Sequence, residues 1–334
     1  MVSAVIFVAT SCVSPLTGFA FWETNLAYEG ESIYNYLQVK NLSDRTILST
    51  NVLFGVQSVT MKDKGLTGMY YDTALAAPAL ADNANSALIL GMGTGTYARQ
   101  LKQYYPKMNI TGVEIDQKIT DPAGEYFDEP ADIPVTTYDG RAWLAASHDK
   151  YDVIMVDAYQ DITIPFQMSS TEFFTMVREH LNPGGVMVVN MNMISDGQGS
   201  INEALSDTIA SVFGNGNTLT ADVPNTTNRE LFAKKPGSGS EENSMQQASK
   251  ALNLRETTYE RTGSEDLEWY MEEVASRFRK VNEPDSASTI LTDDKAPVEV
   301  LGMHAIDQII ADEAGPYRQI LKDEGFGGLL RAVQ

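Results

Sequence analysis

A glycine-rich turn follows a short apolar run in the first third of the chain. Leu88-Ile89-Leu90 leads directly into Gly91-Met92-Gly93-Thr94-Gly95, and a helix is expected from Tyr97. Because glycines leave out the side chain, the backbone there can approach a ligand at the N-terminus of the helix. The spacing is G-x-G-x-G with Thr96 at the sixth position, and the Walker lysine is missing. The turn therefore predicts a nucleoside pocket and disfavours NAD and ATP.

Acidic residues stand at the ends of the next three strands that the sequence predicts. Glu114 and Asp116 end the second strand, Asp139 with Gly140 ends the third, and Asp157 ends the fourth. A carboxylate at the second strand end can accept both hydroxyls of a ribose, and Asp139 offers an acceptor for the amino group of adenine. Each acid alone is equally well explained as a helix N-cap. Together with the glycines they predict one site outside the carboxyl ends of the strands.

The elements that carry these residues alternate between strands and helices. Such alternation predicts a doubly wound, Rossmann-like parallel sheet, closed by a hairpin around Pro224-Asn225. A helix is also expected just before this sheet, at 73–80. Strands are predicted at 87–90, 109–114, 133–138, 151–156 and 186–190, helices at 97–104 and 171–181, and the hairpin at 218–223 and 229–233.

Composition divides the chain into regions. Short runs rich in Tyr, Val, Ile and Thr at 33–39, 46–48 and 54–59 predict a small antiparallel β module before the sheet. A Gly/Ser-rich stretch after Lys235 has linker composition, and an acidic helical region follows. The predicted regions are a candidate membrane anchor at 1–22, the β module at 23–66, the α/β domain at 67–234, a linker at 235–250 and the helical C-terminal region at 251–334.

Overall composition limits the classes of partner. The formal net charge of −21 would repel nucleic acid, and it makes a cationic ligand more plausible than an anionic one. One cysteine, Cys12, excludes an intrachain disulfide, and three histidines without a Cys/His cluster exclude a structural zinc site, so no metal is expected.

The first 22 residues have no charged side chain before Glu23, a length near that of a bilayer-spanning helix. Seven Ser, Thr, Pro and Gly residues dilute this run, and it lacks the basic start of a secretory signal. A membrane anchor, a cleaved signal and an ordinary buried start remain open at this point.

The order of these motifs resembles the spermidine synthases, the polyamine aminopropyltransferases. The resemblance extends from Glu31 to Ala233, through Gln57, Tyr70-Tyr71-Asp72 and the motifs described above. It implies a sheet of the S-adenosylmethionine-dependent methyltransferase type and the transfer of an aminopropyl group from decarboxylated S-adenosylmethionine to an amine such as putrescine. It also implies a homodimer.

Three further segments resemble bacterial members of this family in which the synthase domain follows membrane-spanning helices. They are Thr67–Asp72, Ile164-Pro165 with Thr171–Phe174, and Leu291-Thr292-Asp293-Asp294-Lys295-Ala296-Pro297-Val298-Glu299. This likeness implies a location at the cytoplasmic face of a membrane, or in the cytoplasm.

By the resemblance, Glu114 binds the ribose, Asp139 the adenine and Gln57 the tail of the donor. Asp157 is the base or the orienting carboxylate for the attacking amine, and Tyr70 hydrogen-bonds that amine. The remaining expected contacts are Gly91, Gly93, Thr94, Gly95, Asp116 and Gly140 for the donor, and Asp72, Gln160 and Asp161 for the acceptor.

Two positions depart from the family pattern. Active members usually read G-G-G-D-G where this chain has Thr94, and D-S-S-D-P where it has Asp157-Ala158-Tyr159-Gln160-Asp161. Loss of a carboxylate that pairs with an ammonium costs about 1.5–3 kcal/mol, enough to change substrate preference. A methyltransferase that uses intact S-adenosylmethionine and a non-catalytic polyamine- or nucleoside-binding domain are therefore the alternatives.

Overall fold

Two β-sheets organise the part of the chain that the computed structural model describes, residues 20, 23–51, 55–159, 164–192, 197, 199–237, 254–304 and 322. The larger sheet has eight strands in the order β12-β10-β11-β9-β8-β5-β6-β7. Its strands are β5 (Ser86–Leu90), β6 (Asn109–Glu114), β7 (Val135–Thr137), β8 (Tyr151–Val156), β9 (Leu181–Met191), β10 (Thr218–Asp222), β11 (Arg229–Lys234) and β12 (Arg279–Lys280).

The connectivity of this sheet sets the position of the site. Strands β7, β6, β5, β8 and β9 are mutually parallel, and β11, β10 and β12 extend the sheet with antiparallel pairs. The chain runs outward from β5 through β6 to β7, then returns to the other side of β5 with β8 and β9. The carboxyl ends of β5 and β8 therefore flank the switch point, where ligands bind in such sheets.

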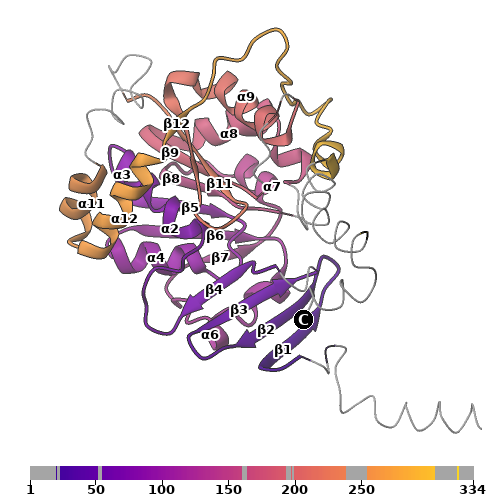
Figure 1. The fold of residues 1–334 in the computed structure, drawn as a ribbon, viewed down its shortest axis with the longest axis vertical. Helices are drawn as coiled ribbons and strands as arrows, with labels where there is room; N and C mark the ends of the chain where they lie inside the picture. The colour runs from indigo at the N-terminus through magenta and orange to yellow at the C-terminus, as the bar shows by residue number, and fades with distance from the viewer. Residues whose placement is uncertain are drawn as a thin grey trace, which may run out of the picture.

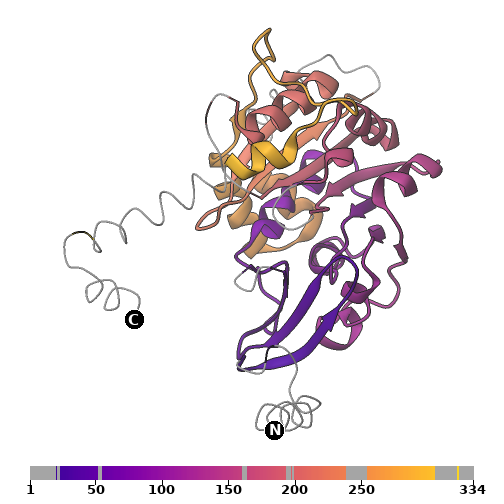
Figure 2. The ribbon, with the colours of Figure 1, turned by 90° about the vertical axis from the view of Figure 1, so that its right-hand side faces the viewer.

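Helices cover both faces of the larger sheet (Figures 1 and 2). Successive residues of β8 point to opposite faces, so Val153 and Met155 belong to one apolar core and Ile154 and Val156 to the other. The first core receives α2 (Tyr70–Ala74), α3 (Ala76–Leu80), α4 (Thr96–Tyr104), α11 (Leu254–Thr262) and α12 (Glu265–Ser276). The second receives α7 (Gly140–Ala146), α8 (Thr171–His180) and α9 (Ile201–Phe213).

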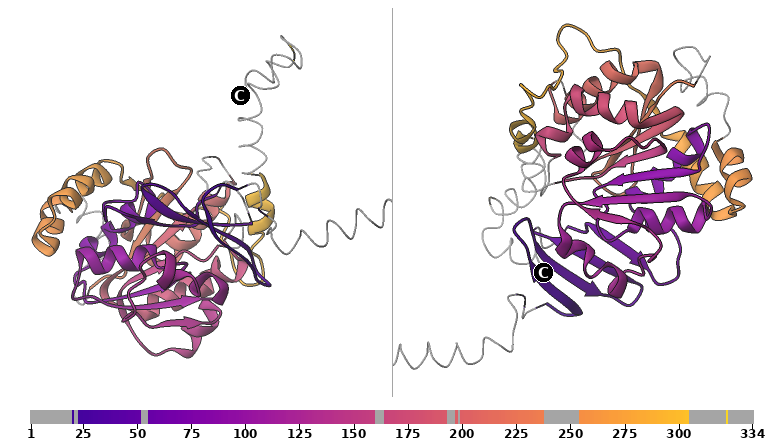
Figure 3. Two further views of the ribbon diagram at one scale, coloured as in Figure 1. Left: turned by 90° about the horizontal axis from the view of Figure 1, so that it is seen from below. Right: turned by 180° about the vertical axis from the view of Figure 1, so that it is seen from behind.

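The smaller sheet is an antiparallel meander that lies beside the β6–β7 end of the larger one (Figures 1 and 3). Its strands are β1 (Leu26–Glu31), β2 (Tyr36–Asn41), β3 (Arg45–Thr50) and β4 (Ser58–Met61). Its buried residues Leu37, Val39 and Leu48 pack on Ile119 and Phe127, next to the short helices α5 (Gln117–Thr120) and α6 (Ala123–Tyr126). The smaller sheet therefore packs directly on the segment that follows Glu114.

The expected fold class is confirmed, and several boundaries differ. The predicted strand 33–39 begins only at Tyr36, because Ser32 Oγ accepts hydrogen bonds from the N–H groups of Tyr34 and Asn35 and closes a turn there. The predicted helix 73–80 is two helices, α2 and α3, which meet at Leu75. Strand β1 was missed in the sequence, β7 is three residues long, and β9 starts directly after α8, at Leu181.

Within the described residues, no helix has the length and apolarity that crossing a bilayer requires. The expected anchor, 1–22, lies outside those residues except for Ala20, and so does most of the expected linker, 235–250. The division of the chain into these regions stays a prediction.

Candidate active site

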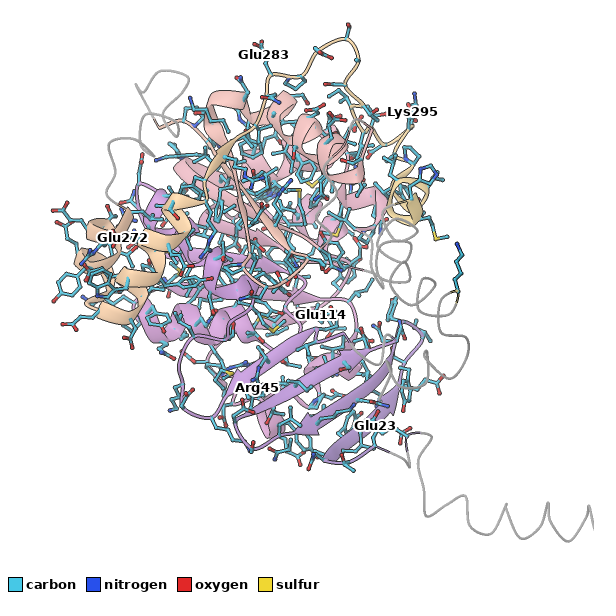
Figure 4. The ribbon with its side chains drawn as sticks, in the orientation of Figure 1. Glu23, Arg45, Glu114, Glu272, Glu283 and Lys295 are labelled. Atoms are coloured by element: carbon cyan, nitrogen blue, oxygen red, sulfur yellow. The ribbon has the colours of Figure 1, made fainter. Side chains whose placement is uncertain are left out.

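A cleft of about 700 Å³ opens at the carboxyl ends of the parallel strands, between the larger sheet and the smaller one. Glu114, labelled in Figure 4, lies where the two sheets meet. The lining from the ends of β5 to β9 and from the segments before α3 includes Gly91, Gly93, Val113, Glu114, Ile115, Tyr138, Asp139, Gly140, Asp157, Ala158, Tyr159, Asn190, Asn192, Gln57, Ser58, Tyr70 and Tyr71.

The glycine turn brings backbone to the floor of the cleft. Gly91 has φ +88°, and a Cβ atom there would lie 2.4 Å from the carbonyl oxygen of Asp157. Gly93, also at positive φ, donates its N–H to Glu114 Oε2 at 2.9 Å. The absent side chains thus let the ends of β5, β6 and β8 converge.

Glu114 is buried at the end of β6 with both oxygens held by the backbone. Oε1 accepts the N–H of Asp116 at 3.1 Å, and Oε2 accepts that of Gly93. Burial raises the pKa of Glu114, while these backbone hydrogen bonds oppose the rise. Each carboxylate oxygen has further acceptor capacity, so Glu114 can take two hydroxyl hydrogen bonds from a ligand.

Asp139 caps α7 and also lines the cleft. Its Oδ1 accepts the N–H of Ala142 at 2.7 Å, which fixes the side chain at the start of the helix. The second carboxylate oxygen remains available to a donor in the cleft, and Gly140 lines the wall beside it.

Asp157 is held from two sides at the end of β8. Its Oδ2 accepts the hydroxyl of Tyr70 at 2.7 Å, and its Oδ1 accepts the Asn190 side-chain amide at 2.9 Å. Burial raises the pKa of Asp157 to about 7, and the charge of Glu114 adds to the rise. A carboxylate with this pKa can change its protonation state near neutral pH, as groups that exchange protons with a substrate do.

The amide that holds Asp157 is itself held. Asn228, directly before β11, donates from Nδ2 to Asn190 Oδ1 at 2.9 Å. Because Asn190 Oδ1 accepts this bond, its amide nitrogen is the atom that faces Asp157. The chain Asn228–Asn190–Asp157–Tyr70 therefore fixes one carboxylate in one orientation.

Four expected site residues do not line the cleft. Asp72 accepts bonds from the Thr67 and Gly68 N–H groups and from Gln100, so it organises the turn before α2. Asp116 caps α5 and accepts Ser32 Oγ at 2.6 Å, which ties the smaller sheet to the larger unit.

Gly95 and Thr94 are the other two. Gly95 caps α4 at φ +84°. The Thr94 side chain is fully buried, its Oγ1 has no hydrogen-bond partner within the described residues, and its carbonyl accepts Arg99 Nη1 at 2.8 Å. Gln160 and Asp161 lie outside the described residues.

Sequence reasoning missed several residues of the cleft. Asn190 lies at the carboxyl end of β9, one residue before its last, so the rule that found Glu114, Asp139 and Asp157 would have found it one strand further on. Asn228 precedes an antiparallel strand and reaches the cleft only through the pairing of β11 with β9, which no local pattern reports. Among the described residues, His, Cys, Asp and Glu form no group of three that could hold a metal ion.

Comparison with known sequences assigns the class of protein. Residues 69–235 match the family described as the spermine/spermidine synthase domain. A probable polyamine aminopropyl transferase of Bifidobacterium longum is 99% identical over 334 residues, which are 100% of this chain and 75% of that protein. A polyamine aminopropyltransferase of Vibrio vulnificus is 28% identical over 209 residues, 60% of this chain and 69% of the relative. The chain belongs to the spermine/spermidine synthase family.

Solved structures agree with this fold. A probable spermidine synthase from Corynebacterium glutamicum superposes with a TM-score of 0.56 at 21% identity, over 80% of this chain and 99% of that one. A spermidine synthase in complex with the transition-state analogue AdoDATO gives a TM-score of 0.55 at 16% identity, over 75% of this chain and 88% of that one. At these sequence identities the structural likeness shows a shared fold and nothing more.

Proposed function

We propose that this protein transfers an aminopropyl group from decarboxylated S-adenosylmethionine to a primary amine of a polyamine such as putrescine. The observation that carries the proposal is the half-buried Asp157, held by Tyr70 and Asn190 in the same cleft as Glu114. The near-identical relative, itself named a probable polyamine aminopropyl transferase, supports the same reaction.

The nucleoside half of the cleft would bind the donor. Glu114 accepts the two ribose hydroxyls with its remaining lone pairs, and Asp139 accepts the amino group of adenine. Exposed apolar groups at the mouth, Ile115 and Tyr138, offer surface to the adenine ring. Gln57, with Gly93, faces the tail of the donor.

Asp157 and Tyr70 would bind and orient the acceptor. The amine arrives as an ammonium ion and loses a proton to Asp157 or to water, which frees its lone pair. That lone pair forms the new C–N bond at the propyl carbon next to the sulfonium as the C–S bond breaks. The electrons of the broken bond go to sulfur, so the leaving group is neutral methylthioadenosine.

The two departures from the family pattern concern residues that the resemblance assigns to the donor tail and to the acceptor. The Thr94 side chain is buried and does not line the cleft, so we assign the contact with the donor tail to Gln57 and Ser58. Gln160 and Asp161 are proposed contacts for the second amine of the acceptor. Asp72, Asp116 and Gly95 would act by holding the elements that carry the binding residues.

One assay on the purified protein tests this function. Decarboxylated S-adenosylmethionine with putrescine is expected to yield methylthioadenosine and spermidine, and intact S-adenosylmethionine is expected to yield no S-adenosylhomocysteine. Formation of S-adenosylhomocysteine would instead establish a methyltransferase. Binding of methylthioadenosine without turnover of either donor would establish a non-catalytic domain.

The family resemblance also supports a homodimer and a location in the cytoplasm or at the cytoplasmic face of a membrane. Analytical ultracentrifugation tests the first proposal and fractionation of cells the second. A monomer at micromolar concentration would overturn the dimer.

A further inference from the structure

A segment near the C-terminus packs against the wall of the cleft although it lies outside the family match at 69–235. This segment, Leu291–Val298, includes Lys295, which is labelled in Figure 4. Leu291 and Val298 are fully buried in the core under α8 and α9. The Leu291 N–H donates to Thr208 Oγ1 at 2.9 Å. The segment is therefore fixed to the larger unit.

Asp293 of this segment forms a two-point ion pair with Arg141. Arg141 Nη1 lies 2.7 Å from Oδ1, and Nη2 lies 2.5 Å from Oδ2. Ser170, the N-cap of α8, donates its hydroxyl to Oδ1 at 2.5 Å. A planar guanidinium that faces a carboxylate in this way is restricted in direction as well as in distance.

Arg141 passes this restraint to the wall of the cleft. It stands in the first turn of α7, directly after Asp139 and Gly140. Its Nη1 also donates to the carbonyl of Gln167, at 2.7 Å, in the short helix η2 (Phe166–Met168). Gln167 lines the cleft too, so one guanidinium joins two of its walls.

We propose that Asp293 is a positioning residue for the nucleoside half of the cleft. It holds Arg141 so that the Asp139-Gly140 turn and η2 keep the spacing that an adenosyl group requires. The proposal rests on the proposed function, because it takes the ligand at Asp139 to be an adenosyl group. The acceptor end, with Asp157, Tyr70 and Asn190, is fixed by separate contacts.

Calorimetry of the full chain with methylthioadenosine tests the proposal. We expect Asp293→Asn to weaken binding about threefold to thirtyfold, the range found for residues that act on a site through intermediate contacts. Asp294→Asn is the matched control. It removes the same charge from the next residue, which makes no hydrogen bond or ion pair within the described residues, and it should leave binding unchanged.

Steady-state kinetics separate positioning from general damage. Asp293→Asn should raise the KM for the donor and leave kcat and the KM for the amine nearly unchanged, with the Tm preserved. Arg141→Lys should weaken the binding of methylthioadenosine to a similar degree. The double variant, Asp293→Asn with Arg141→Lys, should bind no more weakly than the more impaired single variant, because both substitutions act through one contact.

Three results would overturn the inference. The first is that Asp293→Asn and the Asp294→Asn control bind methylthioadenosine equally well. The second is that the losses of binding free energy add up in the double variant. The third is that Asp293→Asn lowers kcat and Tm together with the affinity. If the wild-type chain itself does not bind methylthioadenosine, the proposed function fails and the inference fails with it. Normal wild-type binding with an unaffected Asp293→Asn variant refutes the inference alone.

Discussion

Asp157 is the residue whose environment most directly predicts a kinetic property. Since burial raises the pKa of Asp157 to about 7, its carboxylate form, which we propose takes the proton of the amine, is present above this pH and absent below it. We expect kcat/KM for the amine to fall as the pH drops through about 7, with a single ionisation on the acid side. A flat profile between pH 6 and 8 would contradict this.

Replacement of the same carboxyl group separates binding from turnover. Asp157→Asn should lower kcat by about 10²–10⁴, the usual effect of losing a proton-transfer group. Affinity for methylthioadenosine should change little, since Glu114 and Asp139 lie on other strand ends. Calorimetry beside the activity assay checks both. If the affinity for methylthioadenosine fell as much as kcat, Asp157 would instead be assigned to binding of the donor.

Glu230 is a buried acid that the proposed reaction does not use. It is fully buried in β11, directly opposite Asn190 of β9, and neither of its oxygens has a hydrogen-bond partner within the described residues. Burial, with a contribution from the charge of Asp157, raises the pKa of Glu230 well above 4.5. At neutral pH the folded protein therefore keeps a proton on Glu230 that the unfolded chain has already released.

This difference makes the protein less stable as the pH rises above the pKa that Glu230 has in the unfolded chain. Glu230→Gln should remove that loss and raise the free energy of unfolding at pH 8 by about 1–3 kcal/mol relative to wild type. Denaturation with urea at pH 5 and pH 8 measures it. Glu272→Gln, on the exposed side of α12, is the control and should follow the wild-type pH dependence. If Glu230→Gln also kept the wild-type pH dependence of stability, Glu230 would ionise freely in the folded protein.

At the scale of elements, the turn between β5 and α4 is the point at which the strands of the site meet. Gly91→Ala would put a Cβ atom 2.4 Å from the carbonyl oxygen of Asp157, at a φ of +88°. We expect a loss of about 1–3 kcal/mol in stability and a displaced Asp157 with reduced kcat. Gly124→Ala, in the helix α6 with no atom within 4 Å of the new Cβ, should be neutral or stabilising. Full activity of Gly91→Ala would show that catalysis does not need the close contact between the ends of β5 and β8.

At the scale of the whole molecule, the net charge of −21 attracts a cationic acceptor. Salt screens this attraction over about 8–10 Å at 0.10–0.15 M. The KM for a polyamine should therefore rise as the ionic strength increases from about 0.02 to about 0.3 M, while the affinity for uncharged methylthioadenosine should stay constant. Equal salt dependence of the two ligands would indicate a change in the protein rather than screening.

Local pattern sufficed where the relevant interaction is local. The strand before Gly91, the helix α4 and the carboxylates at the ends of β6 and β8 all follow from apolar runs bounded by glycine or acid. In a parallel sheet, such ends share one edge, so the order of residues along the chain was enough to expect Glu114, Asp139 and Asp157 together.

Only the tertiary structure decided which polar side chains of the motifs reach the cleft. Asp72, Thr94 and Asp116 sit in the motifs themselves, yet their side chains turn into the protein to complete a turn, a core and a helix cap. Sequence spacing places a residue on an element to within a turn, whereas the direction of a side chain depends on the partners that other elements supply.

Long-range pairing was likewise beyond the sequence. Asn228 meets Asn190 because β11 inserts antiparallel beside β9, and Asp293 meets Arg141 across 152 residues. The order of motifs along the chain determined the fold class, the family resemblance and the edge of the sheet that holds the site. The orientation of Asp157 and the walls of the nucleoside half were decided by contacts between distant segments, because their hydrogen-bond partners become neighbours only when the sheet has formed.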